Sequence, residues 1–218
     1  MSDAASDVAV ASTGDRRKRQ PRPGAVRWAA AAALAGRQWG VVDDAALRAL
    51  GFSASAVDRS VASARLHRRH SGVYSVTAGG LSPEGRCLAA VLAAGDGAAL
   101  SHRSAAALWE LSERHPRTVE VTAARRGRRQ RLAGVLVHES RRLANDQFTF
   151  CRGIAVTTVS RTLADLAAVV SPRDLARAME RADLLQQLDV PSLLEASVRR
   201  PGAAAVRRVL SDWAPAPT

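Results

Sequence analysis

The chain has 218 residues, a formal net charge of +12 at pH 7 and 47% hydrophobic residues. This length and apolar content predict one or two domains with a substantial core. The excess positive charge points to an anionic partner such as nucleic acid. A membrane-spanning protein is not expected, because no stretch reaches the roughly 20 apolar residues that cross a bilayer. Two cysteines, Cys87 and Cys151, are too few for a disulfide framework or a structural zinc site.

The first 24 residues are polar and then basic, ending in DRRKRQPRPG. This composition predicts a disordered arm, which either stays solvated or follows a phosphate backbone. The arginines before the alanine-rich stretch resemble a twin-arginine export signal, but Arg27 and Arg37 flank a stretch that is short and mostly alanine. We therefore expect a basic tail that runs into a helix, and a cytoplasmic protein without a membrane partner.

Three short helices are predicted between residues 25 and 65. The first ends near Gly40 and carries an apolar stripe formed by Trp28, Ala31, Ala32, Ala35 and Trp39. Asp43 is placed to cap a second helix that ends at Gly51, and Ser53 or Ser55 is placed to cap a third. The expected inward residues of the third helix are Val57, Val61 and Ala64.

A hairpin is predicted after the third helix. Ser71-Gly72 is a turn signal between Leu66–His70 and Val73–Val76, and Tyr74 and Val76 alternate as in a strand. Three helices followed by a hairpin are typical of a winged helix-turn-helix. In that fold the third helix enters the major groove and the wing touches the flanking backbone. We therefore predict such a domain over residues 25–78.

The predicted DNA contacts follow from this arrangement. Arg59 is the candidate for a base edge, since arginine forms a bidentate pair with guanine. The arginines between helix and hairpin are candidates for phosphates, because each phosphate contact releases counterions. The predicted DNA-binding residues are Ser53, Ser55, Arg59, Ser63, Arg65, Arg68, Arg69 and Tyr74. Two alternatives stay open: an Arg/His cluster is often only a solvated face, and winged helices also bind proteins. Asp58 would repel phosphate if it faced DNA.

Residues 79–218 predict an α+β domain with a helical end, so the fold class expected for the chain is α+β. Helices are expected after Ser82 or Pro83, after Ser101, after Thr158 or Ser160, and over residues 172–188, 191–198 and 202–213. Strands are expected over Arg117–Ala123, in the returning stretch GVLVHES, and on both sides of Gly153. The basic stretch RRGRRQR between two of these strands is predicted to be a hairpin tip, either solvated or in contact with nucleic acid or an acidic partner.

No stretch predicts an active site, so we expect a protein that is not an enzyme. Ser101 and His102 are neighbours, but adjacent helical residues do not face each other, and a capping serine beside a partly buried histidine is expected. His115 and His138 stand isolated in the sequence. Glu120 lacks the nearby lysine of restriction-type nucleases, because Lys18 is the only lysine. Without a glycine-rich phosphate loop or metal-ligand spacing, no cofactor and no metal are expected.

Four stretches occur in a fixed order: LAGRQWGVVDDAALRALGFSASAVDRSVASARLHRRHSGVYSV, AALSHRSAAALWEL, VHESRRL and GIAVTTVSRTLADLA. Together they resemble the AbiEi family of antitoxins, particularly its actinobacterial group, over about Ala25 to Ala182. The resemblance implies an N-terminal winged helix-turn-helix that binds inverted repeats near its own promoter and represses the operon. Its groove helix would be Ser53–Arg65 and its wing Leu66–Val76.

The resemblance also implies a second domain that supports antitoxicity and a nucleotidyltransferase-like toxin, encoded next door, as partner. The second basic surface would be formed by Arg125, Arg126, Arg128, Arg129, Arg131, Arg141 and Arg142. Many actinobacterial relatives continue into an endonuclease-like domain, whereas this sequence stops at Thr218. The expected function is a DNA-binding transcriptional repressor and antitoxin of a toxin–antitoxin operon. The alternatives are a protein-interaction module without DNA binding and an inactive remnant of an endonuclease-like protein.

Overall fold

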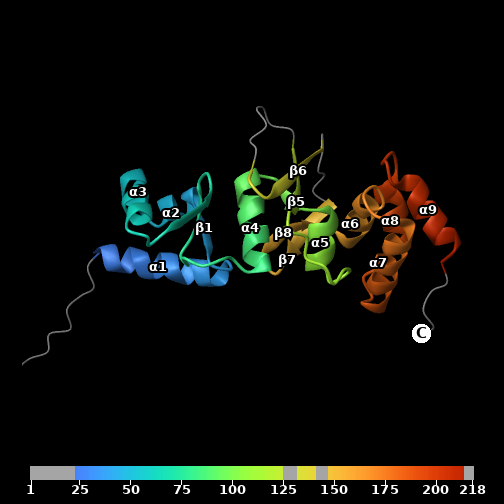
Figure 1. Cartoon of the computed structure of the whole chain (residues 1–218), viewed down its shortest axis with the longest axis horizontal. Coiled ribbons are helices and arrows are strands. Elements are labelled where there is room, and N and C mark those ends of the chain that lie inside the picture. Colours follow the sequence, from blue (N-terminus) through green and yellow to red (C-terminus); the bar gives the residue numbers. More distant parts are fainter. Residues whose placement is uncertain (1–22, 125–131, 141–146, 214–218) are drawn as a thin grey trace, which may run out of the picture.

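The computed structural model describes residues 23–124, 132–140 and 147–213, which form a mixed α+β fold with two sheets. Figure 1 shows the elements as three groups along the long axis of the molecule: α1 to β3, then α4 to β8, then α6 to α9. Three separate clusters of buried apolar residues provide the cores. Among the described residues, no helix is both long and apolar enough to span a bilayer.

The N-terminal group contains α1 (Pro23–Arg37), β1 (Val41–Asp43), α2 (Asp44–Ala49), α3 (Ala54–Ala62), β2 (His67–His70) and β3 (Val73–Ser75). Its three strands are antiparallel, in the order β1-β3-β2. Its core is formed by one face of α1, by the inner sides of α2 and α3 and by Tyr74 of β3. The expected alternation of short helices and a hairpin is therefore present.

Local signals placed most boundaries of this group correctly. The Asp43 side chain accepts a hydrogen bond from the Ala46 amide (2.8 Å), and Ser53 accepts one from Ala56 (3.2 Å), so both act as N-caps as predicted. Gly72 has φ +70° in the turn between β2 and β3, where glycine is the residue without steric cost. The hairpin prediction is confirmed, whereas β1, which pairs with β3, was not predicted.

The end of α3 differs from the prediction. The helix ends at Ala62, and Ala64 is exposed with φ +54°, so Ala64 is not an inward residue. Ser60 is buried instead. Its hydroxyl donates to the Ala56 carbonyl oxygen at 2.6 Å, so the polar atom is satisfied within the helix. Periodicity alone missed this serine because it is polar.

The middle group contains α4 (Pro83–Ala94), β4 (Ala99–Leu100), α5 (His102–Leu108), β5 (Val119–Ala124), β6 (Val135–Ser140), β7 (Phe148–Cys151) and β8 (Ile154–Thr157). The five strands lie in the order β6-β5-β4-β8-β7. The predicted hairpin around Gly153 is confirmed, since β7 and β8 are antiparallel. The predicted hairpin of β5 and β6 is wrong, because these strands are parallel and a tight turn cannot join parallel strands.

The C-terminal group is helical, as predicted, with α6 (Val159–Leu166), α7 (Pro172–Leu184), α8 (Val190–Ser197) and α9 (Ala203–Ser211). Leu163, Leu175, Met179, Leu193 and Val206 form its fully buried centre. Such burial of aliphatic side chains is the main source of stability for a short-helix cluster.

The N-terminal group packs on α4. The Trp39 indole donates to the Arg152 carbonyl oxygen at 3.1 Å. Gly85 of α4 leaves room for the Trp39 carbonyl oxygen, which would lie 2.8 Å from an added Cβ. Val41 and Val73 share one core cluster with α4 and the five-stranded sheet. This contact uses β1 and β3, so α3 lies at the end of the molecule away from that sheet (Figure 1).

Candidate nucleic-acid interface

The outward side of α3 is small and polar. Ser55 and Arg59 are exposed, while Val57 on the opposite side is 4% exposed and belongs to the core. Ser53 and Ser63, at the two ends of the helix, are also exposed, although the Ser63 hydroxyl donates to the Ser60 carbonyl oxygen at 3.3 Å. The predicted contact residues of the helix therefore share one accessible side with a single guanidinium at its centre.

Arg59 has no carboxylate partner within the described ranges, so its charge is open to a ligand. Asp58 is exposed as well. At 3.6 residues per turn, Asp58 and Ser60 lie on opposite flanks of Arg59. The one acidic side chain of α3 therefore faces away from the side that Ser60 occupies, and its repulsion does not cover the whole surface.

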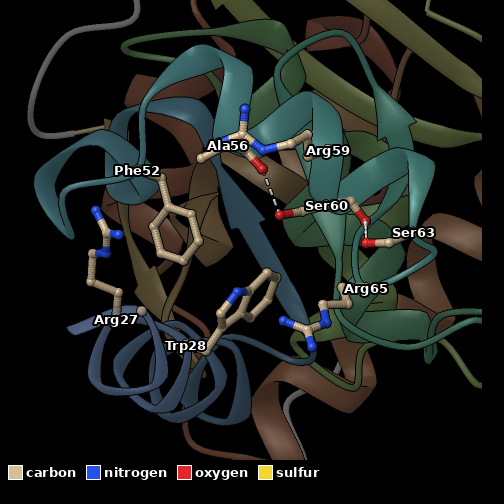
Figure 2. Close-up of a pocket in the computed structure, with 9 residues that line it drawn as sticks. Arg27, Trp28, Phe52, Ala56, Arg59, Ser60, Ser63 and Arg65 are labelled. Carbon is tan, nitrogen blue, oxygen red and sulfur yellow. Dashed lines mark hydrogen bonds between the residues drawn. The ribbon is translucent and has the colours of Figure 1, made fainter. Parts of the chain in front are cut away.

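A pocket of about 220 Å³ opens on the Ser60 flank, between α1 and α3. Figure 2 shows Arg27 and Trp28 of α1 below Phe52, with Ser60 and Arg65 opposite them. The indole of Trp28 meets the Phe52 ring edge-on, with centroids 5.2 Å apart and planes at 85°. In the sequence, Trp28 belongs to a predicted core stripe, and only its neighbour Arg27 indicates a site that combines an aromatic ring with positive charge.

Two predicted phosphate contacts, Arg65 and Arg68, are exposed at the exit of α3 and on β2. The guanidinium of Arg65 lies 5.6 Å from the centre of the Trp28 ring, and that of Arg68 lies 5.2 Å from the centre of the Tyr74 ring. These cation–π contacts hold the stems of both side chains while the charges stay in reach of solvent. Arg65 and Arg68 thus extend the positive surface from α3 to the hairpin.

The other two predicted contacts are turned into the protein. Arg69 sits in a β-bulge, and its guanidinium donates to the Ser75 hydroxyl at 2.8 Å and to the Thr77 carbonyl oxygen at 2.9 Å. Tyr74 is 3% exposed, and burial, followed by nearby Asp44, raises the pKa of its hydroxyl. Both side chains therefore brace the hairpin instead of lining the exposed surface.

Three segments that carry predicted basic residues fall outside the described residues. The tail up to residue 22 is one of them, and the other two are 125–131 and 141–146. These two carry the predicted second surface, Arg125, Arg126, Arg128, Arg129, Arg131, Arg141 and Arg142. The interface described here therefore consists of α3, the residues after it and strand β2.

A second polar cluster lies on the five-stranded sheet. Glu120, 5% exposed, accepts hydrogen bonds from the Arg103 amide (2.7 Å) and guanidinium (3.1 Å). The imidazoles of His102 and His138 stack with centroids 3.6 Å apart. His138, which stands isolated in the sequence, therefore has a neighbouring histidine in the fold. His102 is buried, as expected, but the predicted capping contact of Ser101 is wrong. The Ser101 side chain makes no cap hydrogen bond in α5, and its hydroxyl oxygen instead lies 3.0 Å from Nδ1 of His102, so these two neighbours do contact each other. Burial, reinforced by His138, lowers the pKa of His102 to about 4.

A buried ion pair continues this cluster into α6. Arg161, 3% exposed, donates through Nε to both carboxylate oxygens of Asp165 at 2.9 Å, and Arg200 lies 3.8 Å from the same carboxylate. Burial raises the pKa of Asp165, while the two arginines oppose that effect. The pair lies within α6, and Arg200, which follows the end of α8, links it to that helix. Its burial and internal pairing are typical of a structural network.

The described part of the chain holds no group of three or more His, Cys, Asp or Glu side chains arranged for a metal ion. The accessible guanidiniums beside small polar side chains instead suit an anionic partner. No protein-family model matches the chain, and no curated protein matches it.

Proposed function

We propose that residues 25–78 form a winged helix-turn-helix domain that binds duplex DNA through α3, and that the protein is a transcriptional repressor. The observation that carries the proposal is the outward side of α3. It bears Ser55, Arg59 and Ser63, is covered by no other described element, and continues into Arg65 and Arg68. Small side chains allow a helix to approach base edges closely, and guanidiniums supply the contacts that DNA requires.

The hairpin supports the same arrangement. The strands β2 and β3 follow α3 directly, and Arg68 projects from β2 as an exposed cation. A wing of this kind meets the sugar–phosphate backbone beside the groove that the helix occupies. Arg59 would then read a base, while Arg65 and Arg68 would neutralise phosphates. DNA binding would also place the protein in the cytoplasm.

The resemblance to AbiEi antitoxins supports a repressor of a toxin–antitoxin operon, with the remaining domain (residues 79–218) serving antitoxicity. A nucleotidyltransferase-like toxin is then the second partner. Co-expression with the product of a neighbouring gene of that type tests this part. Relief of its toxicity is the expected result, and undiminished toxicity would leave the repressor role alone.

The DNA-binding role is tested by selecting duplexes from a random library and measuring the enriched sequence with Arg59→Ala and Arg68→Ala. Loss of one bidentate base contact costs about 1–3 kcal/mol of discrimination, so Arg59→Ala should relax the preference at one position. Arg68→Ala should weaken all duplexes alike and keep the preference. Arg207→Ala, an exposed arginine on α9, is the control. Failure to enrich any sequence would favour a protein-interaction module.

A further inference from the structure

The pocket between α1 and α3 combines an aromatic wall with positive charge. Its volume of about 220 Å³ lies below the roughly 300–1,000 Å³ of pockets for drug-sized ligands, so it suits a molecule of one or two rings. Its lining contains Arg27, Arg59 and Arg65 and no acidic residue. These features favour a ligand that is small and negatively charged.

Two of the three arginines, Arg27 and Arg65, are held in place before any ligand arrives. Arg27 donates through Nη1 to the Gly51 carbonyl oxygen at 2.8 Å, and its guanidinium carbon lies 5.9 Å from the Phe52 ring centre. Arg65 is held over Trp28 in the same way. The guanidinium of Arg59, on the opposite wall, has no hydrogen bond or ion pair to a described residue. Preorganised cations of this kind lose little entropy when they bind a carboxylate.

The aromatic pair selects for a ring. Trp28 and Phe52 meet edge-on and both line the pocket. Phe52 is 6% exposed and Trp28 is half-buried, so Trp28 offers most of the accessible aromatic surface, which favours a further ring in an edge or offset contact. Ala56 and Ser60 on the α3 wall are small, and the Ser60 hydroxyl is already bonded to the Ala56 carbonyl oxygen. The site thus offers a flat apolar space with guanidiniums at its rim.

We propose that this pocket binds a small aromatic carboxylate, with the ring against Trp28 and Phe52 and the carboxylate on Arg59 and Arg65. The pocket shares Arg59, Ser63 and Arg65 with the surface proposed to bind DNA, so ligand and DNA compete for the same cations. The competition rests on the proposed function. The ligand site itself does not.

Calorimetric titration of the full chain with benzoate and with indole-3-carboxylate tests the site. Both should bind, while benzamide and acetate, which lack the charge or the ring, should bind at least about tenfold more weakly. Arg59→Gln should weaken benzoate by a similar factor, and Arg207→Gln should not change it. Ala56→Leu fills the pocket, keeps every arginine and retains good helix propensity, so it should abolish binding in a protein that still folds.

Equal binding of benzoate and benzamide, or of benzoate and acetate, overturns the site, and so does benzoate binding that survives Ala56→Leu. Inorganic phosphate that matches benzoate in affinity overturns the ring specificity. Competition is measured by adding benzoate to a protein–DNA complex, and release of DNA at the ligand concentration found by calorimetry is expected. DNA binding without benzoate binding refutes this inference alone, whereas benzoate binding without DNA binding refutes only the proposed function.

Discussion

The guanidinium of Arg65 lies 5.6 Å from the centre of the Trp28 ring, so the end of α3 is joined to α1 by a cation–π contact. Arg65 therefore stabilises the N-terminal group and adds charge to the proposed DNA surface. Arg65→Ala should lower the free energy of unfolding by about 0.5–1 kcal/mol, the usual range for an exposed cation–π pair. Urea unfolding measures this change, with Arg207→Ala as the control. Equal free energies of unfolding for Arg65→Ala and Arg207→Ala would show that the cation–π contact does not stabilise the protein.

Gly72 is required by the turn that forms the wing. Its φ is +70°, and an added Cβ would lie 3.2 Å from the Asp44 carboxylate. Gly72→Ala should cost about 1–2 kcal/mol because a side chain is strained in this backbone region, and it should weaken DNA binding. Gly153→Ala, with φ +77° and open space around the Cβ, imposes similar strain in the β7–β8 turn. A loss of DNA affinity as large for Gly153→Ala as for Gly72→Ala would contradict the role of the hairpin.

Gly85 controls the packing of the N-terminal group on α4. An added Cβ would lie 2.8 Å from the Trp39 carbonyl oxygen, which is backbone and cannot move away cheaply. Gly85→Ala should therefore destabilise the protein by about 1–3 kcal/mol. Gly36→Ala, in α1 with nothing near its Cβ, should instead stabilise by up to about 1 kcal/mol. The midpoint of thermal unfolding should fall for Gly85→Ala and rise for Gly36→Ala. A lower midpoint for Gly36→Ala would contradict this prediction.

The buried histidine cluster predicts how stability depends on pH. The pKa of His102 is lowered from 6.5 to about 4 in the folded protein, so between these values the unfolded chain binds more protons. The contribution of His102 to the free energy of unfolding is therefore complete above pH 6.5 and is lost as pH falls toward 4. Between pH 7 and pH 5 this loss amounts to about 2 kcal/mol.

His102→Asn isolates this effect, because asparagine tolerates the φ of +51° found at His102 and does not titrate in this range. Urea unfolding at pH 7 and pH 5 should show a smaller loss of stability for the variant than for the wild-type chain. The same loss in both proteins would mean that His102 does not carry the pH dependence.

Local signals in the sequence were sufficient for much of the N-terminal group. Asp43 and Ser53 mark helix starts because a short polar side chain caps the backbone amides three residues on, and Gly72 marks the turn through its backbone freedom. Strand β1 has three residues and β4 has two, which is too few for alternation to be recognised. The parallel pairing of β5 and β6 depends on tertiary packing, which alternation does not encode.

The candidate site shows the same limit. Arg68 and Arg69 are adjacent and chemically identical, yet a bulge exposes one and turns the other onto Ser75. Likewise, His102 and His138 come from a helix and a strand that meet only in the folded sheet. Composition and spacing indicate the charged segment that follows α3. Only the fold distinguishes an exposed arginine such as Arg68 from one such as Arg69 that is bonded within the protein.

The most direct test of the account is the salt dependence of duplex binding by the full chain, measured by fluorescence anisotropy. The chain in which Arg59, Arg65 and Arg68 are all changed to glutamine should lose affinity. The magnitude of the slope of log K against log salt should fall by about two, because Arg65 and Arg68 are the proposed phosphate contacts. A control removes the same charge from the exposed Arg173, Arg207 and Arg208 of the C-terminal helices and should bind like the wild type. An unchanged slope for the first variant, or an equal fall in the control, would contradict binding through α3 and the hairpin.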